Sequence, residues 1–394
     1  MDLFKKCQNF VLADEYKEKG IYPYFHALES KQDIEVEMEG KRQIMIGSNN
    51  YLGLTSHPDV IEAAIEATAN FGTGCSGSRF LNGTTTAHLE MEKEIAKFMG
   101  KEDCITMSTG FQTNLGVISA IAGRGDVIVC DKENHASIYD AIKLSYADMV
   151  RYRHGDMVDL EDKLKNIPEG KGILIVTDGV FSMSGEICKL PEIIELKKKY
   201  GARVLVDDAH ALGILGENGR GTAEYFGLED EVDLITGTFS KSLASIGGYC
   251  VGDAKVIDYI RHTSRPFIFS ASITPASIAT VRKALQIIQD EPERKENLLA
   301  ISDYMRKALK ERGVKIIDSI TPIIPIYTYE PETTLVACKM LFDRGVYVNP
   351  VLPPATPPGE CLIRTSYTAT HTPELMDEAA DIIRDVLKEL DIIE

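Results

Sequence analysis

The sequence lacks the features that mark membrane-spanning and nucleic-acid-binding proteins. No stretch approaches the roughly 20 consecutive apolar residues that a spanning helix needs. The 43 lysines and arginines are outnumbered by 60 aspartates and glutamates, so the formal net charge is −17. Because no long basic tract offsets this charge, the overall field repels nucleic acid. We therefore expect neither a transmembrane segment nor a nucleic-acid partner.

Paired cysteines are also missing. The eight cysteines are scattered, no Cys-x-x-Cys pair occurs, and Cys130 lies inside the apolar run Val127–Cys130. This distribution indicates reduced core cysteines rather than a disulfide framework or a zinc site, and we expect no bound metal. The first residues, Met-Asp-Leu-Phe-Lys-Lys, lack the apolar core of a signal peptide. We therefore expect a cytoplasmic protein.

Short apolar runs alternate with helix-like segments between about residues 100 and 255. The runs are continuous rather than alternating, as expected for strands that are buried on both faces. They cover residues 104–107, 127–130, 148–152, 172–177, 203–207, 232–236 and 248–252. The segment Leu190–Tyr200 places a proline at a helix start and lysines at its end. The pattern predicts an α/β fold with a mostly parallel seven-stranded sheet between helices, and ligands at the carboxyl ends of its strands.

A chain of 394 residues is long enough for two domains. We expect a large domain over residues 46–280 and a smaller α+β domain over 281–394, with residues 1–45 packing against the small domain. Thr372-Pro begins an amphipathic C-terminal helix whose apolar residues recur at helical spacing, which indicates a core face.

Lys241 is the residue with the most specific chemistry. It follows an apolar run and stands among small hydroxylated residues, and Asp207 ends another apolar run upstream. An enzyme that uses pyridoxal 5′-phosphate (PLP) needs a lysine to form a Schiff base with the cofactor and a carboxylate to pair with its pyridinium nitrogen. An exposed loop lysine is the alternative when Lys241 is considered alone.

Other residues near the predicted strand ends suit the same cofactor. The turn Ser108–Asn114 supplies backbone N–H groups and hydroxyls at a helix start, which favours phosphate, although a plain glycine turn is an alternative. Thr238 and Ser240 add hydroxyls. His210 stands three residues after Asp207 and could bond the phenolic oxygen of the cofactor; a helix cap and a surface histidine are the alternative for this pair.

Two further residues suggest contacts with the ring and the substrate. His135 follows the run 127–130, where an imidazole could stack on the pyridine ring; alone it could equally be a structural histidine. Arg364 ends a short apolar run, and its bidentate guanidinium is a natural anchor for a substrate carboxylate. A surface ion pair is the alternative for Arg364.

Taken together, these segments resemble the α-oxoamine synthases. Those are fold-type I PLP enzymes that condense a small amino acid with an acyl-CoA and release CO2. The similarity runs from Gly47 to Arg364, and the motifs occur in family order. The segments that carry it are Gly47–Gly53, Asn134–Ser137, Asp178–Met183, Asp207–His210, Gly216–Gly221 and Gly237–Lys241.

Within this family, several segments resemble the members that use L-serine and palmitoyl-CoA. These segments are Gly77–Thr84, Ser108–Gln112, Gly237–Lys241 and Tyr347–Asn349 before Pro353–Pro357. The resemblance implies formation of 3-oxosphinganine, CoA and CO2, the first step of sphingolipid synthesis. Leu352 stands where some serine-using relatives carry a second arginine. Glycine C-acetyltransferase and 8-amino-7-oxononanoate synthase activities stay open as alternatives, as does a non-catalytic partner subunit.

The resemblance also implies a role for each site residue. PLP would be covalently held by Lys241, with His135 stacked on its ring, Asp207 at its pyridinium, and His210 and Ser182 at its polar edge. Its phosphate would be bound by Gly110, Phe111, Thr238 and Ser240, and by Phe269 and Ser270 of a second copy in a homodimer with shared active sites. Asn50, His135 and Arg364 would bind the substrate. Peripheral contact with a membrane is left open.

Overall fold

The structure is a computed structural model that describes residues 2–394. The chain divides into two compact units, which are Asn49–Leu299, and Met1–Ser48 together with Ala300–Glu394. The boundary near residue 300 falls within a long helix, α13 (Glu293–Glu311). Each unit has its own sheets and is described separately.

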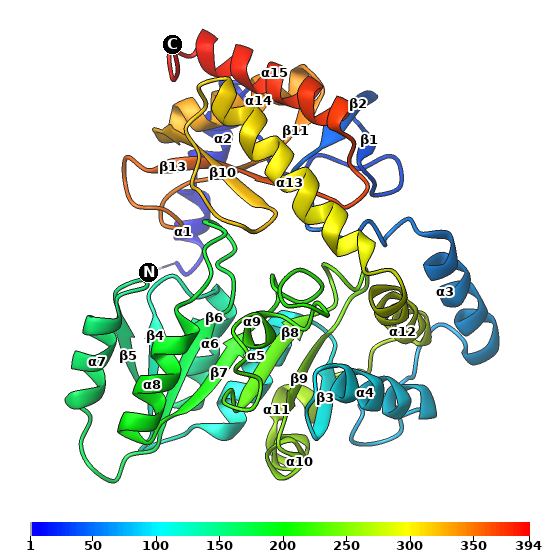
Figure 1. Cartoon of the computed structure of the whole chain (residues 1–394), viewed down its shortest axis with the longest axis vertical. Helices are drawn as coiled ribbons and strands as arrows, with labels where there is room; N and C mark the ends of the chain where they lie inside the picture. The colour runs from blue at the N-terminus through cyan, green and yellow to red at the C-terminus, as the bar shows by residue number, and fades with distance from the viewer. Residues whose placement is uncertain (1) are drawn as a thin grey trace. The chain divides into compact units, whose positions relative to one another are not determined.

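A seven-stranded sheet forms the centre of the larger unit (Figure 1). Its strands are β3 (Asp103–Met107), β4 (Val127–Asp131), β5 (Asp148–Tyr152), β6 (Ile173–Asp178), β7 (Arg203–Asp207), β8 (Leu234–Thr238) and β9 (Gly248–Gly252). They lie in the order β3-β9-β8-β7-β6-β4-β5. Strand β9 is antiparallel to β3 and β8, and the remaining pairs are parallel. The predicted mostly parallel sheet is confirmed.

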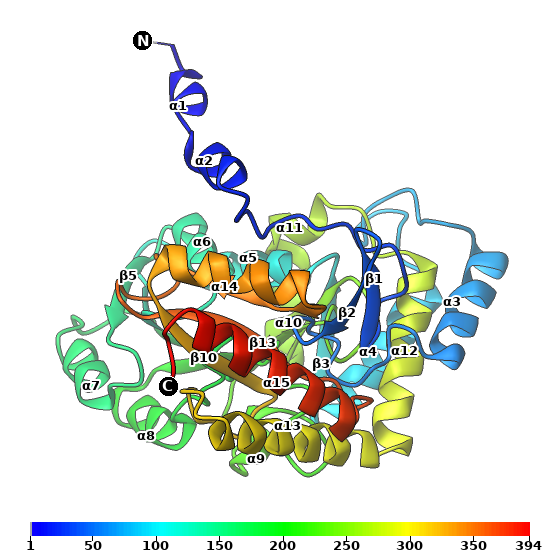
Figure 2. The same cartoon turned by 90° about the horizontal axis from the view of Figure 1, so that it is seen from above.

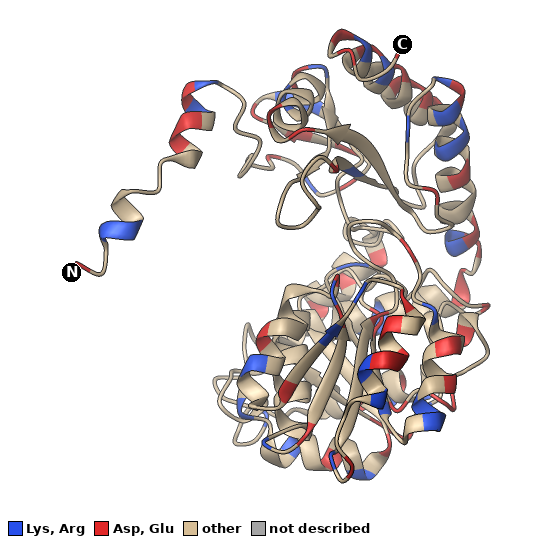
Figure 3. Ribbon diagram, turned by 90° about the vertical axis from the view of Figure 1, so that its left-hand side faces the viewer, with Lys and Arg blue, Asp and Glu red and all other residues tan. Residues whose placement is uncertain are grey.

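The strands of this sheet are buried because their residues are apolar on both faces. Every residue of β4, β8 and β9 is buried, and in Figure 3 the charged residues concentrate on helices while the strands are largely tan. Side chains such as Ile128 and Val176 pack with Ile118 and Ile138 from flanking helices. Each such buried side chain stabilises the fold by about 1.5–3 kcal/mol relative to its exposure to water.

Helices follow the strands and carry recognisable start signals. Side chains of Thr109, His135 and Asp156 accept backbone N–H groups at the starts of their helices, as N-caps do. The helices of this unit are α3 (Pro58–Phe71), α4 (Thr86–Phe98), α5 (Gly110–Ile121), α6 (Ala136–Ser145), α7 (Met157–Lys165), α8 (Leu190–Tyr200), α9 (Thr222–Tyr225), α10 (Ala254–Thr263), α11 (Arg265–Ile268) and α12 (Pro275–Asp290). The helix predicted at Leu190–Tyr200 is confirmed as α8.

The smaller unit combines two three-stranded sheets with helices, as an α+β unit does. One sheet has the order β1-β2-β11 and the other β10-β13-β12. The strands are β1 (Glu35–Met38), β2 (Lys41–Met45), β10 (Ile323–Tyr329), β11 (Val346–Tyr347), β12 (Asn349–Val351) and β13 (Cys361–Ser366); the helices are α1 (Lys5–Gln8), α2 (Leu12–Glu18), α14 (Pro331–Asp343) and α15 (Pro373–Glu389). In Figure 2, α1 and α2 extend away from β1 and β2.

The predicted C-terminal helix is confirmed as α15. The Thr372 hydroxyl accepts the Leu375 N–H at 3.4 Å, and Pro373 occupies the first helical position, where a missing N–H costs nothing. Its apolar face is buried, including Ile383 and Val386. Within residues 2–394, no helix combines the length and apolar character that crossing a bilayer requires.

Candidate active site

A pocket of about 380 Å³ lies at the carboxyl ends of the parallel strands of the larger unit. This edge is where open α/β sheets bind their ligands. The pocket brings together residues from the loops after β3, β4, β6, β7 and β8. The predicted residues that line it are Gly110, Phe111, His135, Ser182, Asp207, His210, Thr238, Ser240 and Lys241.

Four other predicted residues lie outside this lining. Asn50 is buried, and its Oδ1 accepts the N–H of Thr55 at 3.3 Å. Phe269 and Ser270 follow α11, with Phe269 exposed by 79%. Arg364 belongs to the smaller unit, where it is buried in β13, the central strand of its sheet.

Asp207 is the last residue of β7 and lines the pocket. Its Oδ2 accepts the side-chain amide of Asn114 at 2.6 Å, and its Oδ1 accepts the N–H of Ala209 at 3.0 Å. Asp178 pairs with it in register at the end of β6. Burial, reinforced by the charge of Asp207, raises the pKa of Asp178 far above its ordinary range. Asp178 is therefore the member of the pair that favours its protonated form.

His135 faces the pocket from the start of α6. Its backbone N–H donates to Asp178 at 3.1 Å, and its ring meets the Phe111 ring edge-on with centroids 6.2 Å apart. Burial lowers the pKa of His135; the charge of Asp207 opposes this and that of Lys241 adds to it. The imidazole is consequently neutral at pH 7.

The part of the pocket formed by Gly110, Thr238 and Ser240 is suited to a phosphate group. Helix α5 begins at Gly110, and the Thr109 hydroxyl accepts the Gln112 N–H at 3.0 Å. A Cβ at Gly110 would stand 2.7 Å from Cβ of Thr238, so only glycine lets the helix start approach β8 this closely. Thr238 and Ser240 place their hydroxyl oxygens 2.9 Å apart. Backbone N–H groups and hydroxyls at a helix start stabilise an anion.

The structure also shows residues whose roles the sequence did not reveal. Asn114, one turn after Gly110, bonds Asp207, and the hydroxyl of Tyr51 lies 2.7 Å from Nδ1 of His210. Ser137 contacts His135. Asn114 and Ser137 lie inside segments that the sequence singled out, but nothing in a local pattern indicates a partner that is distant along the chain.

A second histidine, His154, joins two of the loops that form the pocket. Its Nδ1 lies 2.9 Å from Asp131, which ends β4 shortly before His135. Its Nε2 lies 3.2 Å from Glu186, in the loop that carries Ser182. Because both ring nitrogens face carboxylates, both are donors and the ring is an imidazolium. His154 thus stabilises the positions of both loops.

The charge of this ring depends on pH in a defined window. Burial opposes protonation, but hydrogen bonds to Asp131 and Glu186 and the charges of Asp131 and Glu133 outweigh it and raise the pKa of His154 to about 10. Since this pKa is raised on folding, its contribution to stability is complete below the unfolded value of about 6.5 and is lost as pH rises through the folded value.

We expect His154→Gln to lower Tm by roughly 2–5 °C at pH 6.5, because charge-assisted hydrogen bonds are lost. The difference in Tm from the wild type should shrink toward pH 10, where the wild-type ring loses its proton. Thermal unfolding followed by circular dichroism at several pH values measures this. The exposed His262 supplies the matched control, His262→Gln. A difference for His154→Gln that stays constant from pH 6.5 to 10 would contradict the assignment.

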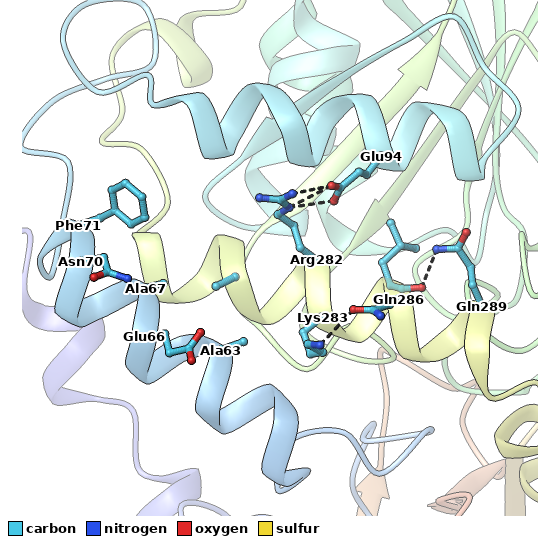
Figure 4. A pocket seen from close by; sticks show the side chains of 12 residues that line it. Ala63, Glu66, Ala67, Asn70, Phe71, Glu94, Arg282, Lys283, Gln286 and Gln289 are labelled. Atoms are coloured by element: carbon cyan, nitrogen blue, oxygen red, sulfur yellow. Dashed lines mark hydrogen bonds and ion pairs between the residues drawn. The ribbon is translucent and has the colours of Figure 1, made fainter.

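A larger groove in the same unit has different chemistry. It measures about 530 Å³ and lies between α3 and α12, with Glu94 of α4 at its wall (Figure 4). Arg282 and Glu94 form an ion pair at 2.7 Å, and Lys283 donates to Gln286 at 3.1 Å. These polar groups form ion pairs and hydrogen bonds with one another. The strand-end pocket instead gathers the predicted lysine, aspartate and histidine around one space. The smaller pocket is therefore the candidate active site.

Comparison with known proteins places these features in a family. The model of the family "Aminotransferase class I and II" matches residues 41–383. A serine palmitoyltransferase of Sphingobacterium spiritivorum is 50% identical over 390 residues, which cover 99% of this chain and 98% of that protein. The 8-amino-7-oxononanoate synthase 1 of Bacillus velezensis is 44% identical over 380 residues, covering 96% and 97%.

A solved structure extends the likeness to the fold. The serine palmitoyltransferase from S. paucimobilis with a bound PLP–myriocin aldimine matches with a TM-score of 0.97 and 36% identity, and both chains are covered in full. The predicted fold-type I architecture is confirmed by this match and by the seven-stranded sheet. This chain is a member of the aminotransferase class I and II family.

Proposed function

We propose that this protein is a PLP-dependent acyltransferase that condenses L-serine with palmitoyl-CoA to 3-oxosphinganine, CoA and CO2. The observation that carries the proposal is the full-length similarity to serine palmitoyltransferases, at 50% identity in sequence and a TM-score of 0.97 in structure. The pocket at the strand ends supplies the chemistry that this reaction requires.

The residues of the pocket fit PLP at three points. The start of α5 and the hydroxyls of Thr238 and Ser240 suit the phosphate, and the charged Asp207 suits the protonated ring nitrogen. Lys241 supplies the amine for covalent attachment, and about 380 Å³ is a typical volume for a small-ligand site. When bound, PLP supplies an electron sink for negative charge that develops at the α-carbon of the substrate.

The residues of the chain then handle protons and orientation. Asp207 would pair with the protonated ring nitrogen, and the N–H groups of Asn114 and Ala209 hold its carboxylate in place. Lys241 removes the proton from Cα of L-serine. The carbon–carbon bond would form between Cα and the thioester carbonyl carbon as the CoA thiolate leaves. The serine carboxyl group would then depart as CO2, and Lys241 would return a proton to Cα in its place. Arg364 and His135 orient the substrate carboxylate; with Leu352 at the second-arginine position, Arg364 is the arginine assigned to it.

A homodimer with shared active sites is part of this proposal. Phe269 and Leu81 are exposed by 79% and 77%, and their segments are joined by the N–H of Ser272, which donates to Gly77. Exposed apolar side chains on two linked segments favour a protein partner, here a second copy whose phosphate Phe269 and Ser270 would reach. The eight cysteines are free, which supports a reducing, cytoplasmic location.

Amino-acid binding spectra test the substrate. We expect L-serine to shift the visible absorbance of the PLP-loaded protein at lower concentration than glycine or L-alanine. The side-chain hydroxyl of L-serine can make hydrogen bonds that the other two amino acids cannot. Product analysis with palmitoyl-CoA and acetyl-CoA measures the acyl preference, with product from palmitoyl-CoA expected. An absorbance shift with glycine or L-alanine and none with L-serine would contradict the assignment of L-serine as substrate.

A second candidate function is 8-amino-7-oxononanoate synthesis. The 44% identity to the Bacillus velezensis enzyme over almost the whole chain favours it. A preference for L-alanine in the same spectra, with turnover of a shorter dicarboxylic acyl thioester instead of palmitoyl-CoA, would identify this activity.

A further inference from the structure

A chain of buried hydrogen bonds connects the two groups that flank the pocket, Asp207 and His135. It passes through Asn114 of α5 and Ser137 of α6, and both side chains are buried. The Asn114 amide nitrogen lies 2.6 Å from Oδ2 of Asp207 and 2.9 Å from Oγ of Ser137. Oγ of Ser137 lies 2.7 Å from Nδ1 of His135. Thr236 of β8 completes the chain at 2.9 Å from Oδ1 of Asn114.

The direction of each hydrogen bond follows from the groups themselves. An ionised carboxylate only accepts hydrogen bonds, so the Asn114 atom beside Asp207 is the NH2 group. Its second hydrogen then donates to Ser137, while the amide oxygen accepts the hydroxyl of Thr236. Rotating the amide by half a turn would face an oxygen to the carboxylate and would leave Ser137 without its donor. The orientation of Asn114 is therefore fixed at three points.

The orientation of Asn114 fixes the proton of Ser137. Because Oγ of Ser137 accepts from Asn114, its own hydrogen is available for the nearest acceptor, which is Nδ1 of His135. The backbone N–H of Ser137 also donates to Nδ1, at 3.3 Å. A ring nitrogen that receives two hydrogen bonds presents a lone pair, so the ring proton is on Nε2.

We propose that Ser137 and Asn114 are positioning residues that hold the His135 ring in the neutral tautomer protonated at Nε2. Protonation of Nδ1 would place a third N–H or O–H donor at a point where two already converge. The titratable groups that face the ring are Asp207, the neighbouring Asp178 and Lys241. Burial adds to the preference for the neutral ring.

This tautomer has two consequences for the reaction, both of which rest on the proposed function. Because Nε2 already carries a proton, it cannot act as a base in the pocket. Its N–H group can instead donate a hydrogen bond to a carboxylate oxygen of the substrate. The neutral ring also leaves the negative charge of Asp207 uncompensated by an imidazolium, so that charge remains available to the cofactor nitrogen. Asp207, Asn114, Ser137 and His135 thus serve both the orientation of the substrate and the charge beside the cofactor nitrogen.

Nitrogen NMR of the PLP-loaded protein with 15N-labelled histidine tests the tautomer directly. The chain has eight histidines, and His135→Gln identifies the signals of His135. We expect the wild-type ring to show a protonated Nε2 and an unprotonated Nδ1 at pH 7. A ring that is protonated at Nδ1 would overturn the proposal. This readout does not depend on turnover, so it separates failure of the proposal from failure of the proposed function.

Variants of the serine provide the second arm of the test. In Ser137→Ala we expect a mixture of tautomers, a higher pH for protonation of His135, and a KM for L-serine raised about tenfold with a smaller change in kcat. Ser137→Thr keeps the hydroxyl and should restore the wild-type tautomer. Ser145→Ala removes another buried serine hydroxyl of α6, which takes no part in the hydrogen bonds from Asp207 to His135. It should leave the tautomer, the protonation of His135 and the KM unchanged. Unaltered tautomer and protonation in Ser137→Ala would refute the role of Ser137.

Discussion

Replacing Lys241 with alanine should lower the rate of 3-oxosphinganine formation by at least about 10³-fold, because general acid–base groups contribute about 10²–10⁴-fold and the covalent attachment is lost as well. Lys241 lines the pocket with Asp207 and His135, and its amine is the group assigned to the α-proton. The rate is measured with L-serine and palmitoyl-CoA. Borohydride reduction followed by intact-mass analysis should show the cofactor fixed to the wild type and absent from the variant.

The control for this experiment is a lysine outside the pocket. Lys255 is exposed at the start of α10, so Lys255→Ala should keep both the rate and the fixed cofactor. Turnover by Lys241→Ala within tenfold of the wild type would show that another group moves the α-proton. A cofactor fixed to Lys241→Ala would show that a different lysine carries it.

Asp207→Asn should lower kcat/KM for L-serine by about 10²-fold, since a hydrogen bond to a charged group contributes about 1.5–3 kcal/mol and each 1.4 kcal/mol is tenfold. The amide has nearly the same shape and its oxygen can still accept from Asn114 or Ala209. The change therefore removes the negative charge that holds the proton on the cofactor nitrogen. Steady-state kinetics and cofactor content, measured on the same preparation, separate loss of rate from loss of cofactor.

The adjacent carboxyl group gives a closely matched control. Asp208 is also buried, and burial raises its pKa to about 7, so near neutral pH a large fraction of it is already uncharged. Its Oδ2 accepts the Thr222 N–H at 2.9 Å, which an amide oxygen can also accept. We expect Asp208→Asn to stay within about threefold of the wild type. Equal losses at both positions would contradict a specific role for the charge of Asp207.

Much of the fold could be predicted because it depends on patterns that are local in the sequence. Continuous apolar runs predicted the strands of the larger unit, and a proline start with a lysine-rich end predicted α8 at its observed bounds. The order of the strands could not be predicted in this way. The insertion of β9 between β3 and β8, antiparallel to both, depends on its pairing with β3, which lies more than 100 residues earlier.

The candidate site likewise contains residues that the sequence predicted and residues that only the structure revealed. Lys241, Asp207 and His135 could be identified from their residue types and from their positions after apolar runs, since strand ends of a parallel sheet meet at one edge. Arg364 was proposed from its residue type and Asn50 by resemblance, and the roles of both stay proposals. Ser137 and Tyr51 could not be found, because neither position carries a chemical pattern that distinguishes it from a structural residue.

The sequence alone determined the type of chemistry and the positions of most strands, because a lysine, a strand-end aspartate and buried apolar runs are properties of short segments. Only the tertiary structure decided which groups bond one another. Asn114 meets residues 23, 93 and 122 positions away, and those contacts set the orientation of its amide and, through Ser137, the proton on His135. Hydrogen-bond partners are chosen by distance and direction in space, and both depend on how the strands are ordered and packed.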